Sequence, residues 1–363
     1  MAISRRAQRL LRRAVFAVTL PVFSCLLALS AFTARSSAQT TGSSQQPAAP
    51  ATSAAKPPAA KPSASKPAPV PQVKAEAHAG QKTFSSEEEA AHALYDAARN
   101  NDENAIVAIL GPDSHDVVMW NDDPAERKAE YDFFTEKFKQ MHRYVKEPDG
   151  ETTLYVGAEN WPLPFPLIQK GGAWFFDVDD GKQELEYRRI GENEMTTIDV
   201  CRALVDAEKE YLAMSAPPNG AHVFAGKFDS SSGRHDGLYW PNDNVAMRSP
   251  IGPFLARAGA DGPDRTPFHG YLFRILTSQG PAGPGGARSY IINGKMTGGF
   301  AFIAFPAAYR QSGAKSFLTG PNGTVYERDL GPMTTMIAEA MKAFDPTTGW
   351  KVVPRETTTS AQK

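Results

Sequence analysis

The chain has 363 residues, of which 41% are hydrophobic, and its 39 basic and 40 acidic residues nearly balance. The charge is uneven along the chain, because residues 83–363 hold 28 basic and 39 acidic residues, a net charge of −11. Such an acidic region argues against nucleic acid and against anionic lipid as the main partner. The length suffices for two domains of ordinary size.

Residues 1–38 have the pattern of a signal peptide. Five arginines in the first 13 residues precede an apolar run at residues 14–32, and small residues follow at 36–38. We therefore expect cleavage near Ala38 and Gln39 and a periplasmic or secreted location. The alternative is a retained segment that anchors the protein and is its only contact with the membrane.

Residues 39–82 read as a linker rich in Ala, Pro and Lys. The segment has too few apolar side chains to offset the entropy of ordering, so we predict that it is disordered. Its five lysines offer a contact to an anionic cell-envelope polymer, while a solubilising spacer explains the same composition.

Residues 83–214 are predicted to form helices and then an antiparallel sheet. A capping box at Ser85 and Glu88 begins the first helix, and Asp123-Pro124 begins the third. Strands follow at residues 152–156 and on both sides of Gly171-Gly172. A helix over residues 193–214 ends this part. Helices followed by a curved antiparallel sheet are similar to the nuclear transport factor two-like cone.

Residues 215–350 are predicted to form a second part built on an antiparallel meander. A short helix begins at Ser249-Pro250, and a closing helix spans residues 333–344 with Met336 and Ile337 facing inward. Residues 351–363 read as a frayed tail.

The meander occupies residues 268–332, where four aromatic and β-branched runs alternate with Gly, Pro and Asn. The run at residues 270–277 is apolar on both faces, so we expect it at the centre of the sheet. Asn293-Gly294 favours a tight hairpin between residues 289–292 and 299–305. This layout is also similar to the C-terminal sheet of type IV pilin-like proteins.

Several long motifs, in one order, resemble a bacterial family. They are HDGLYWP (235–241), SPIGPFLA (249–256), FHGYLFRILTSQGPAGPGG (268–286), NGKMTGGFAFIAFPAAY (293–309) and VYERDLGP (325–332). Together with residues 84–211 they make the chain similar to the family catalogued as domain of unknown function 2950 (DUF2950). The resemblance implies an exported bacterial protein and no established activity.

Two histidines are the candidates for acid–base chemistry, because an imidazole titrates near neutral pH. They are His235 and His269, and their candidate carboxylate partners are Asp236, Glu327 and Asp329. The alternative is that each ring satisfies a backbone group in a turn. The sequence has no zinc-binding HExxH, no phosphate-binding loop and no GxSxG, so we expect neither a metal nor a cofactor.

A set of aromatic residues and one arginine lie near polar groups and are candidates for ligand binding. They are Tyr239, Trp240, Tyr271, Arg274, Tyr309 and Tyr326. Aromatic rings stack on sugars and peptides, but they also fill cores. Cys201 lies on one predicted helical face with Met195 and Val205, which indicates a small core residue rather than a nucleophile.

We therefore expect an exported, envelope-associated protein that acts as a non-catalytic binding or structural module. Its partner is a cell-envelope polymer or another envelope protein. The alternative is an envelope hydrolase that uses His235 or His269 with a nearby carboxylate. Because HDGLYWP and FHGYLF share a histidine followed by aromatic residues, we also expect these two segments to lie close together at one rim of the sheet.

Export generates the first testable prediction. N-terminal sequencing of the protein recovered from the cell envelope or the medium should give a sequence that begins near Gln39. Intact Met1 in protein that stays in the cytosol would contradict both the cleavage and the location.

Overall fold

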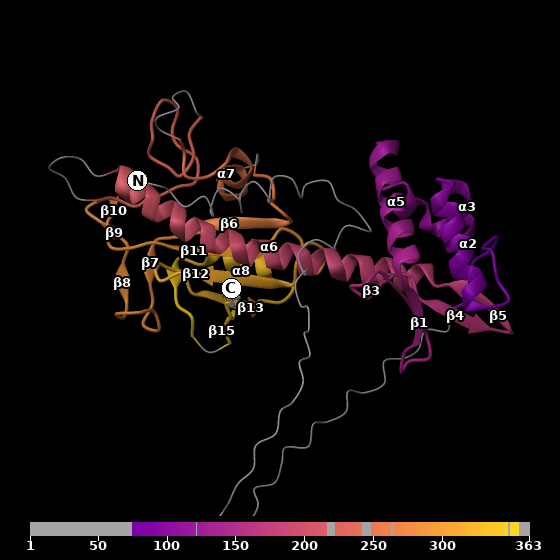
Figure 1. The fold of residues 1–363 in the computed structure, drawn as a ribbon. Helices are drawn as coiled ribbons and strands as arrows, with labels where there is room; N and C mark the ends of the chain where they lie inside the picture. Colours follow the sequence, from indigo (N-terminus) through magenta and orange to yellow (C-terminus); the bar gives the residue numbers. More distant parts are fainter. Residues whose placement is uncertain are drawn as a thin grey trace, which may run out of the picture. The chain divides into compact units, whose positions relative to one another are not determined.

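The computed structural model describes residues 75–120, 122–215, 222–241, 248–262, 265–347 and 349–355. Its helices and mainly antiparallel sheets make it an α+β protein, which confirms the combination of helices and antiparallel strands expected from the sequence. By their contacts, the described residues divide into two units between Gly181 and Lys182 (Figure 1). The predicted signal peptide, most of the predicted linker and the end of the tail lie outside the described residues. Among the helices that are described, none is long and apolar enough to cross a membrane.

The first unit, residues 75–181, begins with helices. They are α2 (Glu87–Arg99), α3 (Glu103–Leu110), the 3-10 turn η2 (Pro112–Ser114), α4 (His115–Val118) and α5 (Pro124–Gln140). The hydroxyl of Ser86 caps α2 by accepting from the N–H of Glu89, whose carboxylate accepts from the N–H and hydroxyl of Ser85. The predicted box at Ser85 and Glu88 was wrong by one residue, because the sequence SSEEE offers the same spacing twice.

An antiparallel sheet completes the first unit. Its strands are β1 (His142–Lys146), β2 (Thr152–Val156), β3 (Trp161–Pro162), β4 (Leu167–Lys170) and β5 (Ala173–Phe176), in the order β1-β2-β4-β5 with β3 paired to β2. Gly171 and Gly172, with φ of +62° and +84°, form the predicted turn. Contacts of α2 with β5 and of α5 with β2 enclose a core that includes Phe134 and Phe176. The nuclear transport factor two-like cone stays a prediction.

Gln81 ties the start of the described chain to this unit. Its Nε2 lies 3.2 Å from the carbonyl oxygen of Ile109, 2.9 Å from that of Leu110 and 2.7 Å from that of Phe176. The predicted linker, residues 39–82, therefore extends too far, because its end already belongs to the folded unit. Composition could not reveal this, because a single glutamine among small and charged residues carries no periodic signal.

The long helix α6 (Val178–Met214) connects the two units along the chain. It begins 15 residues before the predicted start at Asn193, because its first half is polar and contains two glycines that read as breaks. Cys201 is fully buried as predicted, whereas Met195 is 58% exposed and does not share its face. The contact-based division falls inside α6, whereas the predicted boundary lies at its C-terminal end.

The strands of the second unit, residues 182–355, form one main sheet and two small ones. They are β6 (Tyr271–Leu276), β7 (Ser278–Gln279), β8 (Arg288–Ser289), β9 (Ile291–Ile292), β10 (Lys295–Met296), β11 (Ala301–Pro306), β12 (Lys315–Thr319), β13 (Val325–Asp329), β14 (Ala343–Phe344) and β15 (Lys351–Val352). The main sheet is antiparallel in the order β15-β13-β12-β11-β6. The small sheets are β14-β7-β8 and the hairpin β9-β10.

The meander is confirmed, but one predicted strand position and one predicted hairpin pairing within it are wrong. β6 lies at an edge of the main sheet and not at its centre, although residues of α7 (Pro253–Gly259) pack beside it. Asn293-Gly294 closes the small hairpin β9-β10, and β11 pairs with β6 and β12 instead. An Asn-Gly turn fixes only its nearest neighbours, so it does not reveal which longer strand lies beside which.

In the second unit, one helix begins later than predicted and the closing helix is shorter than predicted. α7 begins at Pro253 rather than at Ser249-Pro250, and α8 (Thr334–Ala340) ends before Phe344, which belongs to β14. Met336 and Ile337 on α8 are 59% and 36% exposed, so the predicted inward face is also wrong. The closing helix packs through Ala338, which is fully buried. The pilin-like layout stays a prediction.

The core of the second unit lies around β11, where all six residues are buried. One face of α6 joins the same core through Cys201, Leu204 and Val205. Figure 1 shows α6 running across the sheet of this unit. This packing holds α6 beside the last strands of the main sheet, β13 and β15, where the candidate site lies.

The buried face of α6 also carries a carboxyl group. The side chain of Glu208 is fully buried, its Oε2 accepts from the N–H of Ala225 at 2.9 Å, and its Oε1 has no hydrogen-bond partner among the described residues. Burial raises the pKa of Glu208 to about 8, although the hydrogen bond from Ala225 lowers it in part. The folded state therefore holds this proton more tightly than the unfolded chain does.

A pH-dependent stability follows from Glu208. The contribution of protonated Glu208 to the free energy of unfolding is complete below the ordinary pKa of 4.5 and is lost as the pH rises through 8. Glu208→Gln removes this titration. The free energy of unfolding of the variant, minus that of the native chain, should therefore rise by on the order of 3 kcal/mol from about pH 5 to about pH 8. Thermal and urea unfolding measure this difference.

Asp206→Asn is the matched control, because Asp206 lies on the same helix with a side chain that is 67% exposed. Its effect should stay constant over the same pH range. Equal pH responses of the Asp206 and Glu208 variants would contradict the assignment of the titration to Glu208.

Candidate binding site

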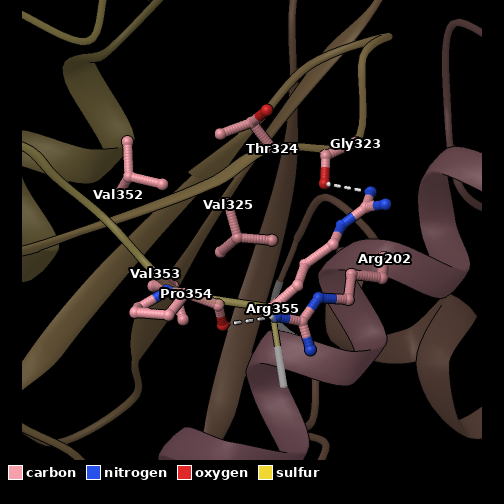
Figure 2. A pocket seen from close by; sticks show the side chains of 8 residues that line it. All are labelled: Arg202, Gly323, Thr324, Val325, Val352, Val353, Pro354 and Arg355. Atoms are coloured by element: carbon pink, nitrogen blue, oxygen red, sulfur yellow. Dashed lines mark hydrogen bonds between the residues drawn. The ribbon is translucent and has the colours of Figure 1, made fainter. Parts of the chain in front are cut away.

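A small pocket in the second unit is bordered by α6, by the turn between β12 and β13 and by the chain that follows β15 (Figure 2). Its volume is about 160 Å³. Its lining residues are Arg202, Gly323, Thr324, Val325, Val352, Val353, Pro354 and Arg355. The pocket therefore combines two guanidinium groups with a mostly aliphatic wall.

Arg202 reaches the pocket from α6. Its Nη1 donates to Asp199 at 2.9 Å, and its Nη2 donates to the carbonyl of Pro354 at 3.4 Å. The Nε–H of Arg202 is buried and has no hydrogen-bond partner among the described residues. A buried donor without an acceptor carries a free-energy cost, so the guanidinium of Arg202 has hydrogen-bonding capacity that its described neighbours leave unused.

Arg355 reaches the same pocket from the chain after β15. Its Nη2 donates to the carbonyl of Gly323 at 3.2 Å, as Figure 2 shows. Gly323 has φ of +70°, and a Cβ at this position would lie 3.1 Å from that Nη2. The positive φ of the turn favours glycine at this position, whereas a Cβ there would need the flexible guanidinium to shift by only a few tenths of an ångström.

The arrangement suits an anion with a small apolar body. A guanidinium stays charged at all ordinary pH values and matches the geometry of carboxylate or phosphate oxygens. Asp199 offsets one of the two positive charges, so the formal charge of the cluster with Arg202 and Arg355 is +1. The small volume admits one anionic group and a short aliphatic part.

His235 and Asp236, predicted as an acid–base pair, are adjacent but engaged with different groups. The exposed ring of His235 stacks on Trp240, with 4.5 Å between ring centroids. Asp236 forms an ion pair with Lys227 at 3.0 Å and accepts from the N–H of Ser231. Partial burial opposes ionisation, but these bonds hold the pKa of Asp236 below its usual value.

The other candidate acid–base residues also have defined neighbours. His269 has φ of +47° and lies edge-on to the ring of Phe268, which assigns it to a tight turn. Glu327 accepts from Lys315 at 3.0 Å, and Asp329 accepts from the hydroxyl of Tyr309 at 3.1 Å. Among the described residues, no cluster of three or more His, Cys, Asp or Glu side chains could hold a metal ion.

Most of the predicted binding aromatics are engaged in packing. Trp240 is 3% exposed, and Tyr271 is fully buried with its hydroxyl donating to the carbonyl of Lys315 at 2.8 Å. Burial raises the pKa of Tyr271 far above its ordinary value. Tyr239 is half-buried beside Phe228, and Tyr326 packs edge-on against a core phenylalanine.

Arg274, the predicted cationic member of that set, braces α8. Its Nη1 donates to the carbonyls of Ala338 and Met341 at 2.7 and 3.1 Å, and its Nε lies 3.3 Å from the carboxylate of Glu339. The guanidinium of Arg274 is therefore engaged by carbonyl and carboxylate groups of the fold itself. Burial likewise raises the pKa of the Cys201 thiol to about 12, which fits a core residue.

Residues 81–353 match the model of the family described as "Protein of unknown function (DUF2950)". The chain belongs to this family. Comparisons with curated proteins and with solved structures found no match. The family match includes Arg202 and the turn at Gly323, but it ends before Pro354 and Arg355. One of the two guanidiniums is thus supplied by residues outside the matched region.

Sequence reasoning missed both arginines of the pocket. Arg202 reads as an ordinary solvated residue of a long helix, and Arg355 lies in a segment predicted to be a frayed tail. No motif joins two residues that are so far apart in the chain. The one local signal near the pocket is the turn-forming sequence Gly320-Pro321-Asn322-Gly323, and the carbonyl of Gly323 accepts from Arg355.

The contrast between Trp240 and His235 is testable. Trp240→Ala should destabilise the fold by on the order of 3 kcal/mol, because it empties a buried site. His235→Ala should cost far less, since its ring is exposed. Thermal unfolding compares the two variants, with Tyr271→Ala and His269→Ala as the second pair. Histidine variants as unstable as the aromatic ones would make these histidines structural and remove the candidates for hydrolysis.

Proposed function

We propose that this member of the family is an exported, non-catalytic, envelope-associated binding module. In this proposal the arginine-lined pocket holds an anionic group of the ligand or partner. One observation carries the proposal: Arg202 and Arg355 arrive from separate segments at a pocket whose other walls are largely aliphatic. Export is supported by the basic and apolar N-terminal pattern and by the small residues that follow it.

The lining favours binding over catalysis. Its eight residues include no His, Cys, Ser, Asp or Glu, so they offer neither a usual nucleophile beside a base nor a pair of acids. Guanidiniums hold and orient anions, but they do not exchange protons near neutral pH. The carbonyl contacts of both arginines fix their positions before a ligand arrives, which lowers the entropy cost of binding.

The alternative remains an envelope hydrolase that uses His235 or His269. The exposed ring of His235 is the observation in its favour, because stacking on the buried Trp240 holds an imidazole at the surface. A panel of envelope-derived ester, amide and glycoside substrates separates the two functions. Turnover that is lost in both His235→Ala and His269→Ala would establish the alternative and contradict a non-catalytic role.

Isobutyrate is a suitable probe of the pocket, because it joins a carboxylate to a short aliphatic body. We expect saturable binding with a Kd on the order of 1 mM, as for a fragment of this size. Arg202→Gln and Arg355→Gln should each weaken binding about tenfold or more, because each removes a charge-assisted hydrogen bond. Chemical-shift titration of the exported protein measures these affinities.

Isobutyramide and Arg257→Gln are the matched controls. The amide has the same shape without the charge and should not bind, and Arg257 is an exposed arginine on α7 outside the pocket lining. Equal weakening by Arg257→Gln would show that the carboxylate responds to surface charge only. Equal binding of amide and carboxylate would contradict an anion site.

A further inference from the structure

The hairpin β9-β10 presents two neighbouring isoleucines to solvent. Ile291 is 43% exposed and Ile292 is 50% exposed. Neighbouring residues of a strand point to opposite faces, so the tip is apolar on both sides. Figure 1 shows β9 and β10 at the margin of the second unit, and they pair only with each other.

The base of this hairpin is fixed in the core. Tyr290 is fully buried, and its hydroxyl lies 3.1 Å from Oε1 of Gln279. Met296, on the opposite strand, is 4% exposed, and its carbonyl accepts from the N–H of Phe224 at 2.8 Å. The two isoleucines are therefore held outward by the fold.

The backbone polar groups near the tip are satisfied within the hairpin. Ile291 pairs with Met296, and Ile292 pairs with Lys295 across the turn. The hydroxyl of Ser289 also donates to the carbonyl of Ile291 at 2.8 Å and accepts from its N–H at 3.1 Å. Such a tip can move from water into an apolar interface at a low free-energy cost, because few of its backbone N–H and C=O groups lose a hydrogen-bond partner.

The charge around the tip is positive, in contrast to the acidic protein as a whole. Residues 281–299 contain Arg288 and Lys295 and no acidic residue. Both cations are exposed, and neither forms an ion pair with an acid among the described residues. Two apolar side chains flanked by free cations match the interface of an anionic bilayer, which is apolar inside and negative at its surface.

We propose that the β9-β10 tip contacts an anionic lipid surface, with Ile291 and Ile292 entering the interface and Arg288 and Lys295 at the headgroups. A folded partner covers one face of a two-stranded hairpin, whereas a lipid interface surrounds the tip and covers both isoleucines. The net charge of −11 over residues 83–363 makes this contact local and reversible rather than the main partner interaction. The proposal goes beyond the pocket and does not depend on it.

An environment-sensitive fluorophore at the tip tests the proposal in the full chain. Ile292→Cys carries the label in a Cys25→Ser background, because Cys201 is fully buried and protected from labelling. With equimolar phosphatidylglycerol and phosphatidylcholine vesicles, we expect a blue shift and quenching by spin-labelled lipid. Arg288→Gln and Lys295→Gln should each weaken binding, so that the half-saturating lipid concentration rises about fivefold.

Met336→Cys carries the same label as the matched control. Met336 is 59% exposed on α8, and both labelled proteins share the same N-terminal segment. The control label should stay in water when the tip label shifts. No shift at the tip, an equal shift at position 336 or an equal response to phosphatidylcholine alone would each overturn the proposal.

Discussion

The second unit depends on the polar contacts that fix one buried face of α6 to its surroundings. Glu194 accepts from two backbone N–H groups at the start of β12. Arg202 donates to the chain after β15, Glu208 accepts from the segment that follows α6, and Tyr211 donates to the turn of His235. Between these points the helix buries Cys201 and its neighbours. Because apolar packing has no direction, such contacts set the rotation and register of the helix on the sheet.

Local chemistry was sufficient to predict the features that involve few residues. The glycine turn before β5 and the start of α5 at Pro124 both follow from φ preferences, and both are confirmed. Strand order did not follow, because pairing of β11 with β6 joins segments on either side of a small hairpin. Similarly, the first half of α6 lacks an apolar stripe, so its helical state could not be read from periodicity.

The candidate site shows the same limit more strongly. Sequence reasoning favoured histidines and aromatics because their side chains carry recognisable chemistry, and the structure places several of them in packing or in local ion pairs. The pocket instead depends on Arg202 and Arg355, whose meaning comes only from their meeting at Gly323 and Pro354. A common residue becomes a candidate ligand contact through the neighbours that the fold supplies. Neighbours of that kind are not encoded at any fixed spacing.

An acidic protein with an arginine pocket constrains how an anion can arrive. An anion that comes within the screening length of the surface, about 10 Å at 0.1 M salt, responds to the net charge of −11 carried by residues 83–363 and is repelled, whereas at longer distances that charge is largely screened. Within contact distance, the two guanidiniums dominate. Added salt therefore screens the repulsion that slows association, and it also weakens the contacts that slow dissociation. Because the net charge of the protein opposes an anion, a bound ligand depends on its fit to the pocket and on aliphatic contacts as much as on charge. The valine and proline walls of the pocket can supply those aliphatic contacts.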